Sequence, residues 1–482
     1  MSLTKQVFIG VKWTALTRLL AQLLNWTITL VVIRLLKPED YGLLAIATGL
    51  LALLTIINEM GLEAALVQRK ILNEELPEKI FGLVLVTNFS LFVLLYLGAP
   101  SFAAFYGEPQ LVDLIRVLAI NHLLYPFMVV PRAMLARRME FRTQGIVDLI
   151  GSACASLATL TLALSGQGVW SLAWGALLET AINMAGILWV AKYWCMPSFD
   201  FRGMRDAMSF GIIETLDRAT WSIQMQIDSL VLGKVLGKEA TGVYFIAKDF
   251  AWLPMRKISN ILNPVAFAGF SRANESDQDV GRLLLVASTI LAFVAFPVFF
   301  GISSTADEVV DLVLGENWNS AAFPLAILSP IVALQMLGSA IIPALSGSGH
   351  PIVNLRQRMV SLIILLFGIF FGIPWGIDGV AVGAAIAYAL GFVVQVVLAC
   401  PVLGLTIREY LGAVSSPLAA ASLMYMIVNI SRFALSDSIG STIQLLLTLV
   451  AIGAISFFAA AWLIDREKLV AVVHTLQRGF AR

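Results

Sequence analysis

Long apolar runs, each about the length of a membrane-spanning helix, follow one another along almost the whole chain. A spanning helix needs about 20 mostly apolar residues. The predicted helices lie at residues 7–33, 41–66, 80–105, 110–131, 144–166, 169–191, 206–233, 240–266, 282–304, 320–345, 356–376, 379–400, 411–431 and 440–463. Pro and Gly interrupt several runs, which membrane helices tolerate where neighbouring helices or cavity water satisfy the freed backbone groups. The pattern therefore predicts an all-α integral membrane protein with about 14 transmembrane helices.

The composition agrees with a membrane protein. Of 482 residues, 59% are hydrophobic and 13% are charged, and the mean hydropathy is +0.87, whereas soluble domains average about 45–50% apolar and about 25% charged residues. A net charge of +1 offers no basic field for nucleic acid. The three cysteines, Cys154, Cys195 and Cys400, are far apart and lack metal-ligand spacing. We therefore expect no metal, no other cofactor and no nucleic-acid partner.

The distribution of Lys and Arg among the turns predicts the orientation in the membrane. When the chain is threaded from a cytoplasmic N-terminus, one face collects most of the Lys and Arg residues. The other face keeps only Arg34, Lys37, Lys234, Lys238 and Arg432, and its longest loop, near 305–319, is acidic. Because short loops rich in Lys and Arg stay in the cytoplasm, both termini are expected there.

The first half of the chain resembles the second half after a shift of 200 residues. Without gaps, residues 13–47 match 213–247 at charged and turn positions that include Arg18, Glu39 and Gly42. A parallel internal repeat follows, with six helices in each lobe. The expected boundaries are 1–195 for the N-terminal lobe, 196–400 for the C-terminal lobe, and 401–482 for two additional helices and a basic cytoplasmic tail.

Motifs that would indicate an enzyme are incomplete. The segment G-K-V-L-G-K-E from Gly233 has three residues between its glycines where a P-loop needs four, and Glu239 replaces the Ser or Thr that would hold magnesium. Asp277 and Asp279 imitate the D-x-D motif of sugar transferases, but lie in a short predicted loop. No catalytic residue is expected, and the chain is expected not to be an enzyme.

Ionisable and polar residues inside the predicted spans are the candidates for function. A charge at the bilayer centre costs about 2.5–3.5 kcal/mol on insertion scales, so such groups usually face other helices or a wet cavity. Helical spacing gathers them into stripes on the first, seventh and eighth predicted helices. The expected substrate-binding residues are Arg18, Gln22, Asn25, Arg218, Trp221, Gln224, Lys248, Trp252 and Arg256, and the expected ion-coupling residues are Glu179, Glu214, Asp217 and Asp228.

The same charges also have a purely structural interpretation. Arg218 has Glu214 one turn before it, and Lys248 has Asp249 beside it, so ion pairing alone would explain them. The equivalence of Arg18 and Arg218 in the repeat favours a functional role for these two. Asp113 and Arg116 in the fourth predicted helix are expected to form a local pair near its outer end.

Several segments resemble the polysaccharide-transporter (oligosaccharide flippase) family of the multidrug/oligosaccharidyl-lipid/polysaccharide exporter superfamily. They are R-L-L-K-P-E-D-Y-G-L-L-A from Arg34, M-G-L-E-A-A-L-V-Q-R-K from Met60, L-A-R-R-M-E-F-R from Leu135, G-Q-G-V-W-S-L from Gly166, S-F-G from Ser209 and D-S-L-V-L-G-K-V-L-G from Asp228. Their order and spacing are most similar to the branch that exports colanic-acid-type exopolysaccharide and lipopolysaccharide units.

The resemblance implies that the two six-helix lobes surround a central cavity, which opens alternately to each side of a bacterial inner membrane. It implies a polyprenyl-diphosphate-linked oligosaccharide as substrate. It also implies that cavity cations hold the diphosphate, which suits Arg18 and Arg218 because guanidinium groups bind phosphate bidentately. Membrane lipid and other polysaccharide assembly proteins are the other expected partners. A small-molecule or drug antiporter of the same superfamily is the alternative, and a polysaccharide polymerase or ligase is a third interpretation.

The predicted orientation can be tested by thiol labelling. Single cysteines replacing Arg137 and Asn317, in a background without the native cysteines, should respond differently to an impermeant maleimide applied to intact cells. The Asn317 position lies in the acidic outer loop and should react, whereas the Arg137 position lies in a basic turn and should react only after permeabilisation. Comparable rates at both positions in intact cells would overturn the helix count.

Overall fold

The computed structural model describes residues 25–55, 66, 75–200, 212–275, 279–436 and 438–480. The secondary structure of these residues is helical throughout. Contacts divide the chain into two compact units, Met1–Gly242 and Val243–Arg482. The predicted all-α membrane fold is confirmed, while the boundaries of the repeat remain a prediction.

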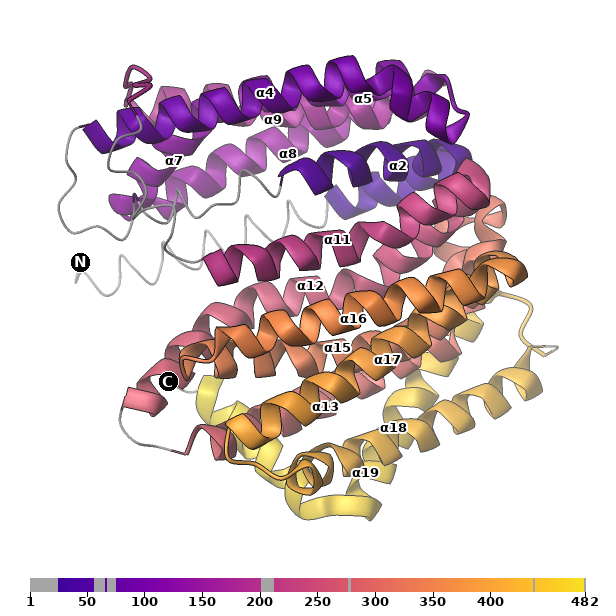
Figure 1. Cartoon of the computed structure of the whole chain (residues 1–482). Coiled ribbons are helices and arrows are strands. Elements are labelled where there is room, and N and C mark those ends of the chain that lie inside the picture. Colours follow the sequence, from indigo (N-terminus) through magenta and orange to yellow (C-terminus); the bar gives the residue numbers. More distant parts are fainter. Residues whose placement is uncertain are drawn as a thin grey trace, which may run out of the picture. The chain divides into compact units, whose positions relative to one another are not determined.

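The helices of the first unit follow the apolar runs. They are Asn25–Leu35, α2 (Pro38–Thr55), α4 (Glu75–Tyr106), α5 (Gln110–Ala119), α6 (Asn121–Leu124), α7 (Pro126–Arg137), α8 (Phe141–Leu164), α9 (Val169–Ala191) and α11 (Ile212–Val235), followed by the start of α12 (Gly237–Glu275). Within this unit α8 packs against α9, α4 against α5, and α2 against α11. Figure 1 shows α4 lying beside α5.

The fourth predicted span is bent. Gln110–Leu124 and Pro126–Arg137 meet at an angle of 43°. Pro126 occupies the first turn of α7 and cannot donate the backbone hydrogen bond that would continue the helix from α6. The sequence predicted one span at 110–131 interrupted by Pro, and the structure breaks it at Pro126.

The second unit contains the rest of α12 and the helices that follow it. They are α13 (Val280–Ser304), α14 (Ala306–Val309), a π-helical turn Val310–Leu314, a 3₁₀ helix Glu316–Ala321, α15 (Ala322–Gly347), α16 (Pro351–Gly372), a 3₁₀ turn Ile373–Trp375, α17 (Gly376–Val402), α18 (Ile407–Leu435) and α19 (Thr442–Phe480). Its main packed pairs are α16 with α17, α13 with α15, α18 with α19, and α13 with α18. The two helices after residue 400 therefore pack on α13.

Glycine makes the α16–α17 hairpin tight. A methyl group on Gly368 would lie 2.4 Å from the Gly383 carbonyl oxygen, and one on Gly372 would lie 2.3 Å from that of Gly379. The backbones of the two helices touch along this seam, as in small-residue packing of membrane helices generally. Gly376, with φ +68°, adopts at the turn a conformation that other residues rarely accept.

An ion-pair cluster joins α18 to α14. The Arg432 guanidinium contacts Asp307 and lies 2.6 Å from the Glu308 carboxylate, whose side chain is only 6% exposed. Nearby, the Thr442 hydroxyl donates to Asp311 at 3.0 Å. The buried Glu308 carboxylate needs a compensating cation, which Arg432 of α18 supplies. Together with the Thr442–Asp311 hydrogen bond, this pair links the acidic segment to the end of α18 and the start of α19.

The described helices also test the predicted spans. Every segment predicted from residue 80 onward overlaps a described helix or the bent pair. By length and composition, eight described helical stretches can cross a membrane, or nine with the bent pair, and one of the eight, Pro351–Val402, contains both α16 and α17. Helices α11 and α12 fall outside this set; they carry charged residues within their length.

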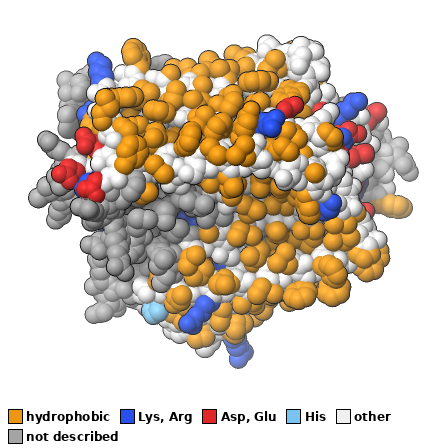
Figure 2. Space-filling model, turned by 45° about the horizontal axis from the view of Figure 1, so that its top comes forward, with side chains coloured by type: hydrophobic (Ala, Val, Ile, Leu, Met, Phe, Trp, Pro, Cys, Tyr) orange, Lys and Arg blue, Asp and Glu red, His pale blue; other side chains and the backbone are white. Residues whose placement is uncertain are grey.

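The surface has the polarity of a membrane protein. Figure 2 shows hydrophobic side chains gathered over the middle of one face, with Lys, Arg, Asp and Glu lying mainly toward its left and right margins. Exposed large side chains on this scale, such as Phe433 at 88% and Leu463 at 83%, are tolerated where hydrocarbon rather than water covers them.

Candidate functional site

The residues of the predicted stripe on α11 are only partly buried. Asp217, Gln224 and Asp228 are buried, at seven- and four-residue spacings that place them near one line of the helix. Trp221 is half-buried, and Arg218 is exposed. Arg18, Gln22 and the side chain of Glu214 lie outside the described residues. The first unit thus presents Arg218 at the edge of a buried polar line.

The predicted stripe on α12 belongs to the second unit. Lys248 and Trp252 are buried, and the Trp252 ring packs edge-on against Tyr388 of α17 with centroids 5.7 Å apart. Arg256 is exposed and donates to the Asp249 carboxylate at 2.6 Å and to the Asp249 carbonyl at 3.1 Å. Asp249 therefore pairs with Arg256, seven residues away, rather than with the adjacent Lys248.

Asn25 and Glu179 meet a polar cluster on α8 that sequence reasoning missed. The Asn25 amide donates to the Ser152 hydroxyl at 2.7 Å. One turn earlier, the Asp148 carboxylate accepts from Arg132 of α7 at 2.6 Å, and it lies close enough to Glu179 of α9 for their charges to interact. The cluster therefore joins α7, α8, α9 and the helix Asn25–Leu35.

Three polar atoms of this cluster are buried and have no hydrogen-bond partner among the described residues. They are the side-chain oxygens of Asn25 and Asn183 and the Nε of Arg132. Asn183 fits against Gly151, where a methyl group would lie 2.2 Å from its amide oxygen. Buried polar atoms are normally satisfied, so the two amide oxygens have unused capacity to accept from a water molecule or to contact a cation, and the Arg132 Nε has unused capacity to donate. The sequence marked Asn25 and Glu179 as candidates. Helix packing alone brings Ser152 to Asn25 and Asp148 near Glu179.

The start of α2 and the start of α12 touch through two glycines. A methyl group on Gly42 would lie 1.7 Å from the Lys238 carbonyl oxygen, and one on Gly242 would lie 1.7 Å from the Pro38 carbonyl oxygen. The contact is reciprocal under the 200-residue shift, which relates Pro38 to Lys238 and Gly42 to Gly242. Only the absence of a Cβ on each glycine allows this approach.

Ionic and polar contacts surround the two glycines, and we call the whole contact the glycine junction. The Lys238 ammonium lies 3.0 Å from the Glu108 carboxylate and 3.8 Å from that of Glu39. The Tyr106 hydroxyl donates to the Leu230 carbonyl at 3.0 Å, and the Lys234 ammonium donates to the Phe105 carbonyl. The glycine junction thus ties α2 and the end of α4 to the α11–α12 turn.

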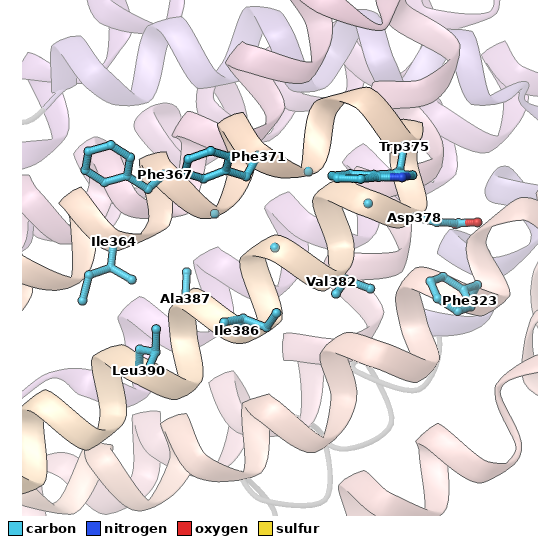
Figure 3. A pocket seen from close by; sticks show the side chains of 14 residues that line it. Phe323, Ile364, Phe367, Phe371, Trp375, Asp378, Val382, Ile386, Ala387 and Leu390 are labelled. Carbon is cyan, nitrogen blue, oxygen red and sulfur yellow. The ribbon is translucent and has the colours of Figure 1, made fainter.

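The second unit carries an apolar groove of about 550 Å³ along the α16–α17 hairpin. Figure 3 shows Phe367 and Phe371 in a row on α16, Trp375 at the turn, and Ile386 and Leu390 on α17. Asp378 is the charged residue of its lining. This groove offers hydrocarbon contact and would repel a phosphate, so it does not suit the diphosphate part of a lipid-linked substrate.

The two enzyme-like motifs have structural roles where they are described. Gly233 lies inside α11, where a methyl group would lie 2.6 Å from the Ile46 side chain. Asp279 caps α13 by accepting from the Arg282 backbone N–H at 2.9 Å, while Asp277 lies outside the described residues. Among the described residues, no group of three or more His, Cys, Asp or Glu could hold a metal ion.

Comparison with known families identifies the chain. The family described as "Polysaccharide biosynthesis protein" matches residues 31–323. The chain belongs to this polysaccharide biosynthesis family. The resemblance noted in the sequence is confirmed.

Relatives in this family are named for polysaccharide assembly. The teichuronic acid biosynthesis protein TuaB of Bacillus subtilis is 28% identical over 76% of this chain and 76% of its own length. The succinoglycan biosynthesis transport protein ExoT of Rhizobium meliloti is 26% identical over 72% and 70%. The lipopolysaccharide biosynthesis protein WzxC of Escherichia coli is 24% identical over 71% and 70%.

Solved structures place the fold among transporters. The lipid II flippase MurJ in an inward closed conformation matches with a TM-score of 0.76 at 13% identity, over 95% of this chain and 99% of that protein. An inward-facing multidrug resistance MATE transporter matches with a TM-score of 0.62 at 15% identity, over 81% and 96%. At these identities the likeness establishes the fold alone: a multi-pass membrane protein of the MurJ and MATE type.

The glycine junction of this family member can be tested with Gly42→Ala. Inside a helix Ala is normally favoured over Gly by about 0.8–1 kcal/mol, yet here the methyl group would collide with the Lys238 carbonyl. We expect α2 and α12 to separate, so that a single cysteine replacing the fully buried Ala47 reacts faster with a maleimide.

Gly98→Ala is the matched control, because a methyl group at that position of α4 meets nothing within 4 Å. It should leave the labelling rate at Ala47→Cys unchanged. If Gly42→Ala also leaves that rate unchanged and does not lower the melting temperature, the glycine junction is not the close contact described above.

Proposed function

We propose that the protein is a flippase for polyprenyl-diphosphate-linked oligosaccharide repeat units, moving them from the cytoplasmic to the outer leaflet of a bacterial inner membrane for exopolysaccharide or lipopolysaccharide assembly. The family match over residues 31–323 carries this proposal. It is supported by relatives named for the assembly or transport of three different surface polysaccharides. Both termini are proposed to be cytoplasmic.

The proposed mechanism is alternating access between two lobes, with boundaries at residues 195 and 400. In one state the lobes open toward the cytoplasm, and in the other toward the outer face. The glycine junction supports this mechanism, because its reciprocal contacts join the equivalent segments of the two proposed repeats at one end of the helices. Closure there requires no covalent chemistry, which is consistent with a transporter rather than a polymerase or ligase.

The substrate is proposed to bind through cations and polar side chains in the central cavity. Arg18 and Arg218 would hold the diphosphate, because a guanidinium offers paired donors to phosphate oxygens. The exposed position of Arg218 beside the buried Asp217 supports this role, since the side chain is not enclosed in the core. The remaining proposed contacts are Gln22, Asn25, Trp221, Gln224, Lys248, Trp252 and Arg256. Other polysaccharide assembly proteins are proposed as partners that supply and consume the substrate.

The driving force is proposed to be an ion gradient that acts through carboxylates inside the bundle. Glu179 is the best supported of the proposed coupling residues, because its charge interacts with that of Asp148, which belongs to the same cluster as the unsatisfied amide oxygens of Asn25 and Asn183. Two carboxylates near one another repel unless a cation or proton joins them. Glu214, Asp217 and Asp228 on α11 are the other proposed coupling residues.

A drug antiporter is the alternative, since the MATE fold is shared. It would export small molecules and would leave surface polysaccharide unchanged when deleted. We favour the flippase because three relatives that each match more than 70% of the chain are named for the biosynthesis or transport of teichuronic acid, succinoglycan or lipopolysaccharide.

The diphosphate clamp is tested by Arg18→Ala and Arg218→Ala. Hydrogen bonds to charged groups contribute about 1.5–3 kcal/mol, so either change should lower export of lipid-linked oligosaccharide roughly tenfold or more. Lys at either position should restore only part of the export, because it keeps the positive charge but lacks the paired N–H donors of a guanidinium. Surface polysaccharide per unit of membrane-inserted protein is the measurement.

Arg408→Ala is the control, because Arg408 is exposed at the start of α18 and outside the proposed cavity. Normal export by both alanine variants would refute the clamp. A fall that merely follows protein abundance would favour the structural interpretation of these arginines.

Ion coupling is tested by Glu179→Gln, which keeps the shape of the side chain and removes its charge. In vesicles with an imposed proton or sodium gradient, wild-type transport should rise with the gradient, whereas the variant should lose that dependence. Glu75→Gln changes a carboxylate that is 65% exposed at the start of α4 and should respond as the wild type does. Undiminished gradient dependence in Glu179→Gln would exclude this residue.

A further inference from the structure

A cavity of about 860 Å³ lies on the first unit, among α4, α5, α6 and α9. None of the proposed substrate or coupling residues lines it. Its walls combine aromatic side chains, including Tyr96, Trp170 and Trp174, with one ion pair, Asp113–Arg116. The combination of aromatic walls and one pair of opposite charges limits what it can bind.

Helix α5 turns its charged side toward this cavity. Leu111, Leu114, Ile115 and Leu118 are buried on the opposite side of the helix. Asp113 and Arg116, with Val117 and Ile120 at the following helical positions, line the cavity. A charged stripe on the lateral side of a spanning segment is costly unless something polar meets it.

The cavity is polar at one end and apolar at the other. At about 1.5 Å per residue, Asp113 and Arg116 lie roughly 5 and 9 Å from the start of α5, and Trp174 roughly 8 Å from the start of α9. Phe92 lies roughly 21 Å from the end of α4 at Tyr106, by the same rise. Charge and Trp therefore mark the membrane-interface end, and the deep end is hydrocarbon-like.

Apolar surface surrounds the cavity on the spanning helices that form it. On α4, Leu94 is 56% exposed and Leu97 is 70% exposed, and Trp174 of α9 is 45% exposed. In the upper part of the view in Figure 2, hydrophobic side chains cover the face, and a small group of adjacent charged side chains interrupts it. Such a surface faces lipid rather than a water-filled passage, so the cavity opens to the bilayer.

The ion pair is loose. The Arg116 Nη1 lies 3.8 Å from the Asp113 Oδ1, and the Nε donates to the Tyr96 carbonyl at the long distance of 3.5 Å. The guanidinium also lies 4.7 Å above the Tyr96 ring. By contrast, Arg132–Asp148 and Arg256–Asp249 close to 2.6 Å. The Asp113 side chain is 72% exposed, so both charges can reach a ligand without breaking a tight pair.

We propose that this cavity is a binding site for a zwitterionic aminophospholipid of the phosphatidylethanolamine type, with its phosphate on Arg116, its ammonium on Asp113 and one acyl chain toward Phe92. A headgroup with one anion and one N–H-bearing cation matches the two charges of the site, whereas an anionic headgroup would leave Asp113 beside a like charge. In the proposed orientation this site lies in the outer leaflet, whereas the choice of lipid does not depend on that orientation. The site holds a resident membrane lipid, separate from the transported substrate.

The test uses the purified full-length chain, delipidated in detergent, with phosphatidylethanolamine, phosphatidylcholine or phosphatidylglycerol of identical acyl chains. Phosphatidylethanolamine should raise the melting temperature saturably and more than the other two, because ligand bound to the native state stabilises it. Phosphatidylcholine keeps the phosphate but lacks N–H donors, and phosphatidylglycerol lacks the ammonium. Native mass spectrometry should show one preferentially retained phosphatidylethanolamine.

Arg116→Ala and Asp113→Asn should each abolish the excess stabilisation by phosphatidylethanolamine, and Asp113→Asn, which keeps size and polarity, guards against misfolding as the cause. Lys79→Ala is the control, because its pair with Glu75 lies at the other end of α4; the lipid preference should persist. Equal shifts with all three lipids, or a larger shift with phosphatidylglycerol, would overturn the proposal. None of these readouts depends on transport, so they do not test the flippase function.

Discussion

The structure depends on one constraint: hydrocarbon offers no hydrogen bonds, so each spanning segment satisfies its own backbone and any side-chain charge needs a partner or water. The described chain meets the first demand with helices alone. It meets the second mainly near helix ends, where Arg432 contacts Glu308 in one unit and Lys238 contacts Glu108 in the other. Some charge remains deeper in the bundle. The buried Asp228 and Lys248 lie on α11 and α12, which are less apolar than the helices able to cross a membrane by length and composition. Those helices are where an aqueous passage is proposed.

Small residues do the complementary work where backbones must approach. The α16–α17 seam and the glycine junction use the same device, with carbonyl oxygens in the space that a Cβ would occupy. Their surroundings differ. The seam borders an apolar groove with no cation in its lining, whereas Lys238 and its two carboxylates surround the junction. Lys238 and Glu108 are half-buried and Glu39 is exposed, so water can replace the partners of these ions when the contact opens. The α16–α17 seam is bordered by apolar side chains, and water offers these no equivalent contact if the two helices separate.

Hydrophobic periodicity was enough to predict most of the fold, because span length and turn polarity are local properties. An interruption at Pro126 was predicted from the sequence, but not the size of the bend, since the effect of Pro on a membrane helix depends on its neighbours. The local pair Asp113–Arg116 was predicted correctly, because three-residue spacing determines it. Asp148 and Ser152 were missed because nothing within α8 marks them; packing brings them to Asn25 and Glu179. Helical stripes did not predict how deeply each member is buried, as the exposed Arg218 shows beside the buried Asp217.

The polar cluster on α8 and the glycine junction lie in the same unit, and helices connect them. Asn25 begins the helix that leads into α2, and α2 carries Gly42. At the start of α9, the Val169 backbone N–H donates to the Asp40 carboxylate of α2 at 2.9 Å. Glu179 lies on α9, whose first residue, Val169, is bonded to Asp40 of α2, two residues from Pro38 and two from Gly42. Coupling between two sites requires a physical element that both can bias, and the α2–α9 contact through Asp40 is the described contact that the proposed coupling at Glu179 would use.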